Sequence, residues 1–332
     1  MPEGHSVHRI ARQFARHFLG VPLAVTSPQG RFALGAARLD GHALVRSEAV
    51  GKQLFLEFDH GLWLRVHLGL YGAWDFAGEI ELDDTSASAG GRIGQTNQRG
   101  TVRGAASSAT VVGAHEGSPW SIGAPRRARL RISEQEQERE LVEFPPDPVG
   151  QVRVRLLAPM AVADLRGPTA CEVITADDAA DVRAKLGPDP LVGDPADNEA
   201  RFIARVRKKA SPIAVLLMDQ SVVSGIGNVY RAELLFRSRI DPFTPGRSLP
   251  AEVASILWRD WDRLLRVGVE TGQMLTMDDL DEESYARALA SRDDRHWVYH
   301  RAGEPCRVCA TTILIREIAG RKLYWCPSCQ AP

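Results

Sequence analysis

The sequence predicts a two-domain α+β protein, with strands in its first half, helices in its second half and a cysteine-rich end. Residues 23–76 contain apolar residues that alternate with a period of two, as in strands. Beyond residue 200 the apolar residues recur at helical spacing, and four of the five cysteines form two C-x2-C pairs near the end. A chain of 332 residues is long enough for two separate cores.

The composition is that of an ordinary globular protein, with 44% hydrophobic and 25% charged residues. The formal net charge of −1 excludes a basic field over the whole molecule, so local basic clusters would have to meet any nucleic acid. The chain contains no apolar run of transmembrane length, and its first residues lack the features of a signal peptide. We therefore expect a cytoplasmic protein with no membrane partner.

The first half begins with a predicted helix over residues 6–19, where apolar residues recur at helical spacing and Gly20 follows. Strands are then predicted at the compact apolar run 53–58 and at the alternating residues 61–70. Glycine-containing turns separate them. The pattern favours hairpins in a sandwich or a meander.

Residues 78–126 are rich in Gly, Ser, Ala and Thr, which predicts a flexible insertion or a pair of poorly packed strands. Strand patterns resume at 128–132 and near 140–144. The proline- and glycine-rich segment 187–195 predicts a linker. The first domain is therefore expected to cover residues 1–186.

The second half is predicted to be helical at 201–219, 229–238 and 252–272. A basic run precedes the segment Gly225-Ile-Gly227-Asn228, which stands just before a helix. Because glycines allow close approach and helix N-termini bind phosphate, this segment is a candidate phosphate clamp. A tight turn between two helices is the simpler alternative.

The cysteine pairs predict a structural zinc site. Sixteen residues separate Cys306-x2-Cys309 from Cys326-x2-Cys329, within the usual zinc spacing of about 15–20. Four thiolates complete a tetrahedral shell and leave no open position for catalysis. The intervening residues indicate two short strands around Gly320, with Arg316, Arg321 and Lys322 available to phosphates or simply to solvent.

The N-terminus offers a candidate nucleophile. Pro2 follows Met1, and a small second residue permits removal of Met1, which exposes a secondary amine. An α-amino group titrates near ~8, and the start of a helix further disfavours its protonation. Such an amine can form an iminium with a sugar aldehyde, with Glu3 as a proton carrier. A proline without any role is the alternative.

Several separated motifs together resemble the formamidopyrimidine-DNA glycosylase and endonuclease VIII family. They are MPEGHSVHR, GKQLF, HLGLYG, SGIGNVYRAELLF and the final CxxC…GRKLYWCPSCQ, and the resemblance is broken mainly at 78–126. It implies an N-terminal β-sandwich with flanking helices. A helix–two-turns–helix domain at 187–297 and a four-cysteine zinc finger at 298–332 would follow.

The resemblance also implies roles for single residues. Pro2 would be the nucleophile that attacks the sugar C1′, Glu3 the general acid/base, and Lys52 a phosphate contact that assists elimination. The implied DNA contacts are His67 on the backbone, Leu70 and Tyr71 in the gap left by a flipped base, and Asn228 and Arg321 as phosphate clamps. One structural Zn²⁺ per chain would be the cofactor, and damaged double-stranded DNA the partner of a monomer.

Two departures from the family pattern bear on the substrate. Ser6 stands where many relatives have a second glutamate, so that role does not transfer. The start PEGH and the motif HLGLYG resemble the endonuclease VIII branch of actinobacterial type, which favours oxidised pyrimidines. The alternatives are an oxidised-purine glycosylase, a zinc-finger DNA-binding protein without catalysis, and an RNA-binding zinc-ribbon protein.

Overall fold

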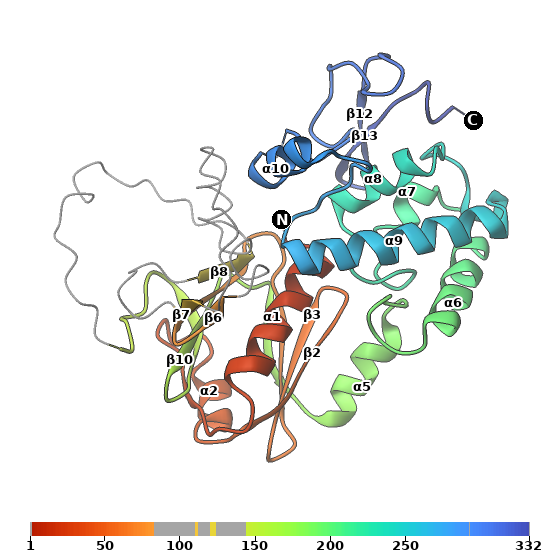
Figure 1. The fold of residues 1–332 in the computed structure, drawn as a ribbon. Coiled ribbons are helices and arrows are strands. Elements are labelled where there is room, and N and C mark those ends of the chain that lie inside the picture. The colour runs from red at the N-terminus through yellow and green to blue at the C-terminus, as the bar shows by residue number, and fades with distance from the viewer. Residues whose placement is uncertain (1, 83–109, 112–119, 124–143, 292, 332) are drawn as a thin grey trace. The chain divides into compact units, whose positions relative to one another are not determined.

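The computed structural model describes residues 2–82, 110–111, 120–123, 144–291 and 293–331. The chain forms two compact units (Figure 1). One, here called the sheet unit, comprises Met1–Pro2 and Ser6–Val182, and the other, the helical unit, comprises Glu3–His5 and Arg183–Pro332. The short segment Glu3–His5 therefore belongs with the second half of the chain.

The sheet unit is a sandwich of two antiparallel sheets, which confirms the predicted β-sandwich. The five-stranded sheet has the order β1-β9-β10-β5-β8 and the four-stranded sheet the order β11-β4-β3-β2. The strands of the first are Ala24–Thr26 (β1), Val152–Leu157 (β9), Ala161–Arg166 (β10), Ala73–Gly78 (β5) and Trp120–Gly123 (β8). Those of the second are Ala170–Ile174 (β11), Trp63–His67 (β4), Gln53–Phe58 (β3) and Leu44–Val50 (β2). A short separate pair joins Glu81–Leu82 (β6) and Thr110–Val111 (β7).

Aromatic side chains fill the core of the sheet unit. Phe14 on α1 (Gly4–His17) and Phe18, which directly follows this helix, are fully buried together with Trp74 and Phe76 of β5. The rings of Phe14 and Trp74 meet edge to face with centroids 4.9 Å apart, an arrangement that aromatic rings favour. The helices α2 (Ala33–Leu39) and α5 (Ala176–Lys185) complete the described elements of this half.

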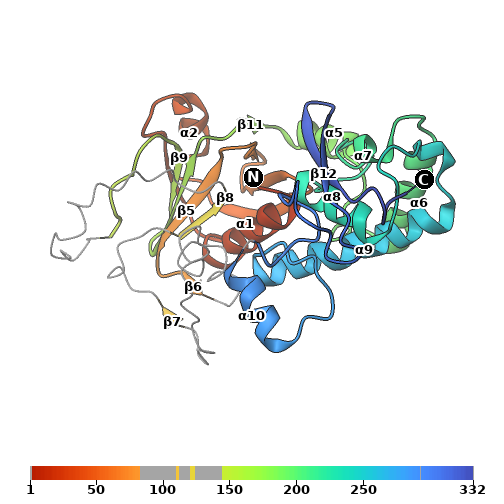
Figure 2. The same cartoon turned by 90° about the horizontal axis from the view of Figure 1, so that it is seen from above.

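The helical unit is built around α9. Its helices are α6 (Pro195–Arg207), α7 (Ile213–Leu216), α8 (Asn228–Arg237), α9 (Ala251–Thr271) and α10 (Glu282–Ala290), with the 3-10 turn η2 (Gly246–Ser248). Figure 2 shows α9 as the long helix of this half. Trp258 and Trp261 of α9 are buried against Phe202 and Tyr230. The chain ends in the hairpin β12 (Leu314–Ile318) and β13 (Arg321–Trp325), as predicted around Gly320.

Two expectations about the helical half need correction. The predicted helix 201–219 is two helices: α6 ends at Arg207, and Pro212, which has no N–H for the interior of a helix, is the N-cap of α7. The expected linker 187–195 is packed into the unit: Asp189 is 2% exposed, and Ser224 Oγ donates to the Gly187 carbonyl at 2.8 Å. An alternation of Gly and Pro gave no sign of this packing.

The predicted insertion 78–126 is described only in part. Residues 120–123 form β8, which pairs with β5 and buries Ile122, so this stretch belongs to the sandwich rather than to a loose insertion. Most of the remainder, with the expected strand 128–132 and residues 140–143, lies outside the described residues. In the described part of the chain, no helix combines the length and apolar character needed to cross a membrane.

Candidate active site

Glu3 is bound at the N-terminus of α8. Its side chain is fully buried, and its carboxylate accepts hydrogen bonds from the backbone N–H groups of Gly227 (2.8 Å), Val229 (2.9 Å) and Tyr230 (3.4 Å). These N–H groups have no partner inside the helix, and the helix dipole favours an anion beside them. A carboxylate one residue after Pro2 is therefore held in a fixed position.

Glycines make room for this carboxylate. A Cβ on Gly227 would lie 2.4 Å from Cδ of Glu3, and Gly4 donates to the Gly225 carbonyl at 2.9 Å. Gly225 has φ +92°, a conformation that strains other residues. The N-terminus of α8 thus receives the protein's own Glu3 carboxylate, and a phosphate contact of the segment 225–228 remains a prediction.

Asn228 and Arg231 join α8 to the C-terminal hairpin. Asn228 Nδ2 donates to the Lys322 carbonyl at 2.9 Å, and Arg231 donates to the same carbonyl at 3.1 Å and to Asn228 Oδ1. These bonds fix the start of β13, where Arg321 is exposed. The two predicted clamp residues, Asn228 and Arg321, are thus brought together in the helical unit.

Arg231 is a site residue that sequence reasoning missed. It is fully buried, and burial lowers its pKa to about 10, although the charge of Glu3 opposes that shift. It remains a cation near neutral pH and balances the buried carboxylate. Its spacing of three residues after Asn228 puts both on one helix face, which was the available signal.

Lys52 and His67 lie at one end of the four-stranded sheet. Lys52 follows Gly51 (φ +59°) in the turn between β2 and β3, and His67 pairs with Gln53 in the register of β3 and β4. Burial lowers the pKa of His67, and the charges of Lys52 and Arg65 lower it further. His67 is therefore neutral near pH 7, and we expect it to meet a phosphate as a hydrogen-bond donor.

Leu70 and Tyr71 form an exposed loop tip between β4 and β5. They are 40% and 71% exposed, and the Gly72 N–H closes the turn on the Leu68 carbonyl at 3.0 Å. Both side chains are therefore accessible to a partner of the protein. An insertion of these two side chains into a base stack remains a prediction.

The four C-terminal cysteines converge on one point. Their sulfur atoms lie within 4.8 Å of one another, with Cys306–Cys329 at 3.9 Å, Cys309–Cys326 at 3.5 Å and Cys309–Cys329 at 3.4 Å. A tetrahedral zinc ion with Zn–S bonds of about 2.3 Å places its sulfurs about 3.8 Å apart. The donor set and spacing therefore fit a structural zinc.

Removal of this zinc is expected to abolish the C-terminal hairpin. Cys326 is fully buried beside Phe236 of α8, and the metal supplies much of the folding free energy of so small a module. We expect Cys326→Ser, or a chelator, to weaken binding to duplex DNA by at least about tenfold, measured by fluorescence anisotropy. Unchanged affinity in protein shown by elemental analysis to lack zinc would contradict this.

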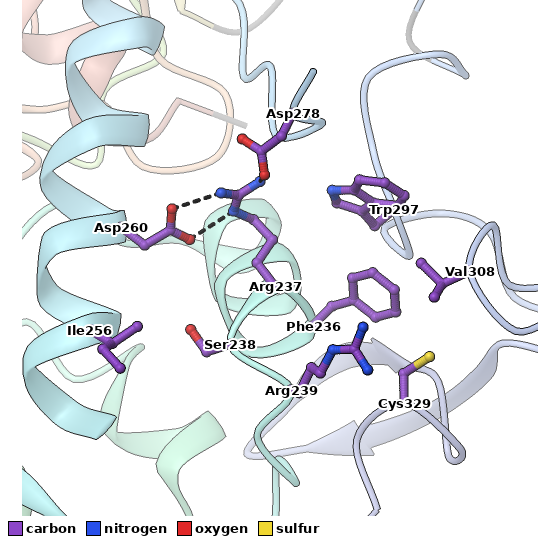
Figure 3. A pocket seen from close by; sticks show the side chains of 10 residues that line it. All are labelled: Phe236, Arg237, Ser238, Arg239, Ile256, Asp260, Asp278, Trp297, Val308 and Cys329. Atoms are coloured by element: carbon purple, nitrogen blue, oxygen red, sulfur yellow. Dashed lines mark hydrogen bonds and ion pairs between the residues drawn. The ribbon is translucent and has the colours of Figure 1, made fainter. Parts of the chain in front are cut away.

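A pocket of about 390 Å³ also lies in the helical unit, beside the C-terminal end of α8 (Figure 3). Arg237 stands between the carboxylates of Asp260 and Asp278, with Arg237 Nε 2.7 Å from Asp260 Oδ2. Burial opposes the charge of Arg237, but these two bonds outweigh it and raise its pKa. Because its charge is compensated, Arg237 is poorly suited to bind a phosphate.

Family models match three parts of the chain. The N-terminal domain of formamidopyrimidine-DNA glycosylase matches residues 1–105, and the H2TH domain of the same enzyme matches residues 186–279. A zinc finger found in formamidopyrimidine-DNA glycosylase and isoleucyl-tRNA synthetase matches residues 303–332. The first model matches residues of the sheet unit, the second matches residues of the helical unit, and the third includes the C-terminal hairpin.

Curated relatives and solved structures agree with these models. Endonuclease 8 1 of Mycobacterium tuberculosis is 38% identical over 330 residues, which cover 99% of this chain and 100% of that protein. Formamidopyrimidine-DNA glycosylase of Thermus thermophilus is 38% identical over 149 residues, 44% of this chain and 54% of that protein. The T. thermophilus MutM structure aligns with a TM-score of 0.62 at 22% identity, covering 99% of this chain and 98% of that one. A Lactococcus lactis Fpg complex with abasic-site DNA gives 0.64 at 19% identity, with 99% and 100% covered.

Proposed function

Because this chain belongs to the family of formamidopyrimidine-DNA glycosylases and endonuclease VIII enzymes, which are DNA glycosylase/AP lyases, we propose that it excises oxidised pyrimidines and then cuts the abasic strand. The observation that supports this chemistry is the buried carboxylate of Glu3, the residue immediately after Pro2. This carboxylate accepts hydrogen bonds from three backbone N–H groups. Such pre-organisation suits a group that must exchange protons at one place.

The proposed reaction begins at the N-terminal amine. With Met1 removed, the Pro2 nitrogen attacks the sugar C1′ of a flipped nucleotide and loses its proton as the damaged base leaves. The C1′–O4′ bond then breaks and O4′ takes up a proton, so that the sugar ring opens and an iminium joins enzyme and sugar. The iminium withdraws electrons, which acidifies the C2′ proton and permits β- and then δ-elimination of the two phosphates. Glu3 and Lys52 would carry the protons in these steps.

We assign the grip on DNA to residues of both units. Asn228 and Arg321 would bind phosphates in the helical unit, and Lys52 and His67 would do so in the sheet unit. Leu70 and Tyr71 would fill the space of the extruded base, which offsets the lost stacking. Phosphate contacts of this kind make affinity fall steeply with salt.

The choice of pyrimidines rests on the branch of the family. The motifs PEGH and HLGLYG are of the endonuclease VIII type, and Endonuclease 8 1 matches the chain over its full length, whereas the T. thermophilus formamidopyrimidine-DNA glycosylase matches 44% of it. Ser6 distinguishes this chain from relatives that have a second glutamate.

Duplexes with single lesions test this assignment. We expect single-turnover release of thymine glycol and dihydrouracil to exceed release of 8-oxoguanine by about tenfold or more, the discrimination that pocket shape commonly supplies. An abasic-site duplex serves as the control, since its cleavage requires no base recognition. Faster release of 8-oxoguanine would overturn the substrate and leave the lyase chemistry intact.

A further inference from the structure

We propose that His42, Asp59 and His60 form a second metal site, which binds one divalent transition-metal ion on the sheet unit. The possible ligand atoms of these three side chains lie within 4.8 Å of one another. None of them is among the residues assigned to DNA or to catalysis above. The site is independent of the proposed function and of the four-cysteine zinc site.

The antiparallel pairing of β2 and β3 brings the three side chains together. Leu44, near the start of β2, pairs with Phe58 at the end of β3, so the residues before one strand lie beside those after the other. Two further bonds fasten the segments: Asp59 N–H donates to the Ala43 carbonyl at 2.9 Å, and Ala43 N–H donates to Asp59 Oδ2 at 3.1 Å. The backbone thus fixes the carboxylate at the centre of the cluster.

The ligand spacings match those around a small metal ion. Nδ1 of His42 lies 2.8 Å from Asp59 Oδ1, and Nδ1 of His60 lies 3.5 Å from the same oxygen. Ligands that bind one ion at about 2.0–2.2 Å stand roughly 2.9–3.5 Å apart in tetrahedral or octahedral geometry. These two distances are therefore compatible with ligands that share one ion.

A backbone contact prepares His60 as a ligand. Its Nε2 lies 3.0 Å from the Arg38 carbonyl. Because a carbonyl can only accept, the proton of the neutral ring must be on Nε2, which leaves the lone pair on Nδ1. In metal sites, a ligating histidine usually donates the N–H of its other ring nitrogen to a carbonyl, a carboxylate or water.

The histidine rings must rotate out of their stack before both can bind one ion. They are stacked with centroids 3.5 Å apart and planes inclined by 19°, whereas an ion bound by both must lie near the plane of each. The side chains of His42, Asp59 and His60 are 40%, 44% and 24% exposed, so the more exposed ring of His42 has solvent into which it can turn. Two imidazoles and one carboxylate select zinc, nickel, cobalt or copper over magnesium and calcium. Without an ion, the same groups form a hydrogen-bonded cluster that only closes the β3–β4 turn.

Cobalt(II) added to tag-free, zinc-loaded, full-length protein tests the site. We expect elemental analysis after gel filtration to find one cobalt per chain with the zinc retained. Cobalt in the cysteine site would give intense thiolate charge-transfer absorption, which should be absent. In NMR spectra, paramagnetic broadening should centre on the rings of His42 and His60. Broadening centred elsewhere, or no retained cobalt, would overturn the proposal.

Single substitutions locate the binding further. We expect His42→Asn and Asp59→Asn each to weaken cobalt affinity by at least about tenfold in calorimetric titrations. Asp177→Asn, which removes an exposed carboxylate from the first turn of α5, is the matched control and should leave affinity unchanged. Equal affinity in all three variants would mean that the cation binds only adventitiously. The NMR experiment uses the wild-type protein, so it tests the site even if a variant folds poorly.

Discussion

Borohydride is expected to trap a covalent complex between this protein and an abasic-site duplex, and Pro2→Leu is expected to abolish it. A secondary amine and a sugar aldehyde form an iminium, which borohydride reduces to a stable cross-link. Leucine at position 2 prevents removal of Met1 and so moves the terminal amine by one residue. Cleavage of the abasic strand should then fall by at least about 10³-fold, as on loss of a covalent nucleophile.

A second variant distinguishes the effect of moving the terminal amine from the effect of losing the proline ring. Pro2→Ala still permits loss of Met1 and leaves a primary amine in place, so we expect a weakened but detectable cross-link. Mass spectrometry of each protein must first establish whether Met1 is present. Full trapping by Pro2→Leu with Met1 retained would contradict the assignment and would point to a lysine, with Lys52 the first to test.

Local patterns were sufficient for most elements. The run 53–58 coincides with β3, the helix expected at 252–272 is α9 within one residue, and the hairpin around Gly320 is present. Each of these patterns depends on side-chain spacing within one element, which the sequence displays directly. The zinc site was equally accessible, because its four ligands stand in two short repeats.

Elements with little apolar periodicity were missed. Helix α5 buries only Ala179, so its sequence carries no hydrophobic stripe from which a helix could be recognised. The segment 187–195 was predicted to be a linker because Pro and Gly usually mark loops, yet its carbonyl groups bond to Ser224 and Asn198. The bond from Ser224 joins residues 37 positions apart, and a contact of this kind leaves no local signal.

The candidate site shows the same limit. The sequence predicts Glu3 as a proton carrier, but the N–H groups that bind its carboxylate are 224 to 227 residues away in the sequence. The glycines before α8 predict a bound anion, but the motif alone does not say which anion they receive. Only the fold reveals that the anion is a carboxylate of the chain itself, balanced by the buried Arg231.

Glu3→Gln is expected to slow strand cleavage by about 10²–10⁴-fold, the usual contribution of a general acid/base. The amide keeps the shape of the side chain but neither exchanges protons near neutral pH nor supplies a charge to the three N–H donors. Its NH2 group must also face donors, so we expect the free energy of unfolding to fall by about 1–3 kcal/mol. Single-turnover rates on an abasic-site duplex, at saturating protein, measure the chemical effect.

Glu233 provides a matched control for the structural part of this effect. It is also fully buried, and its carboxylate accepts from the backbone N–H groups of Trp297 (2.8 Å), Val298 (2.9 Å) and Tyr299 (2.8 Å). Glu233→Gln should therefore lose similar stability in urea unfolding while its cleavage rate at saturation changes by only a few-fold. If both variants lose rate equally, Glu3 acts through the packing of α8, and the proton transfers must be assigned to another group. Both substitutions replace a buried carboxylate that accepts three backbone hydrogen bonds. A loss of rate confined to Glu3→Gln would therefore show that the Glu3 carboxylate acts in the chemical step.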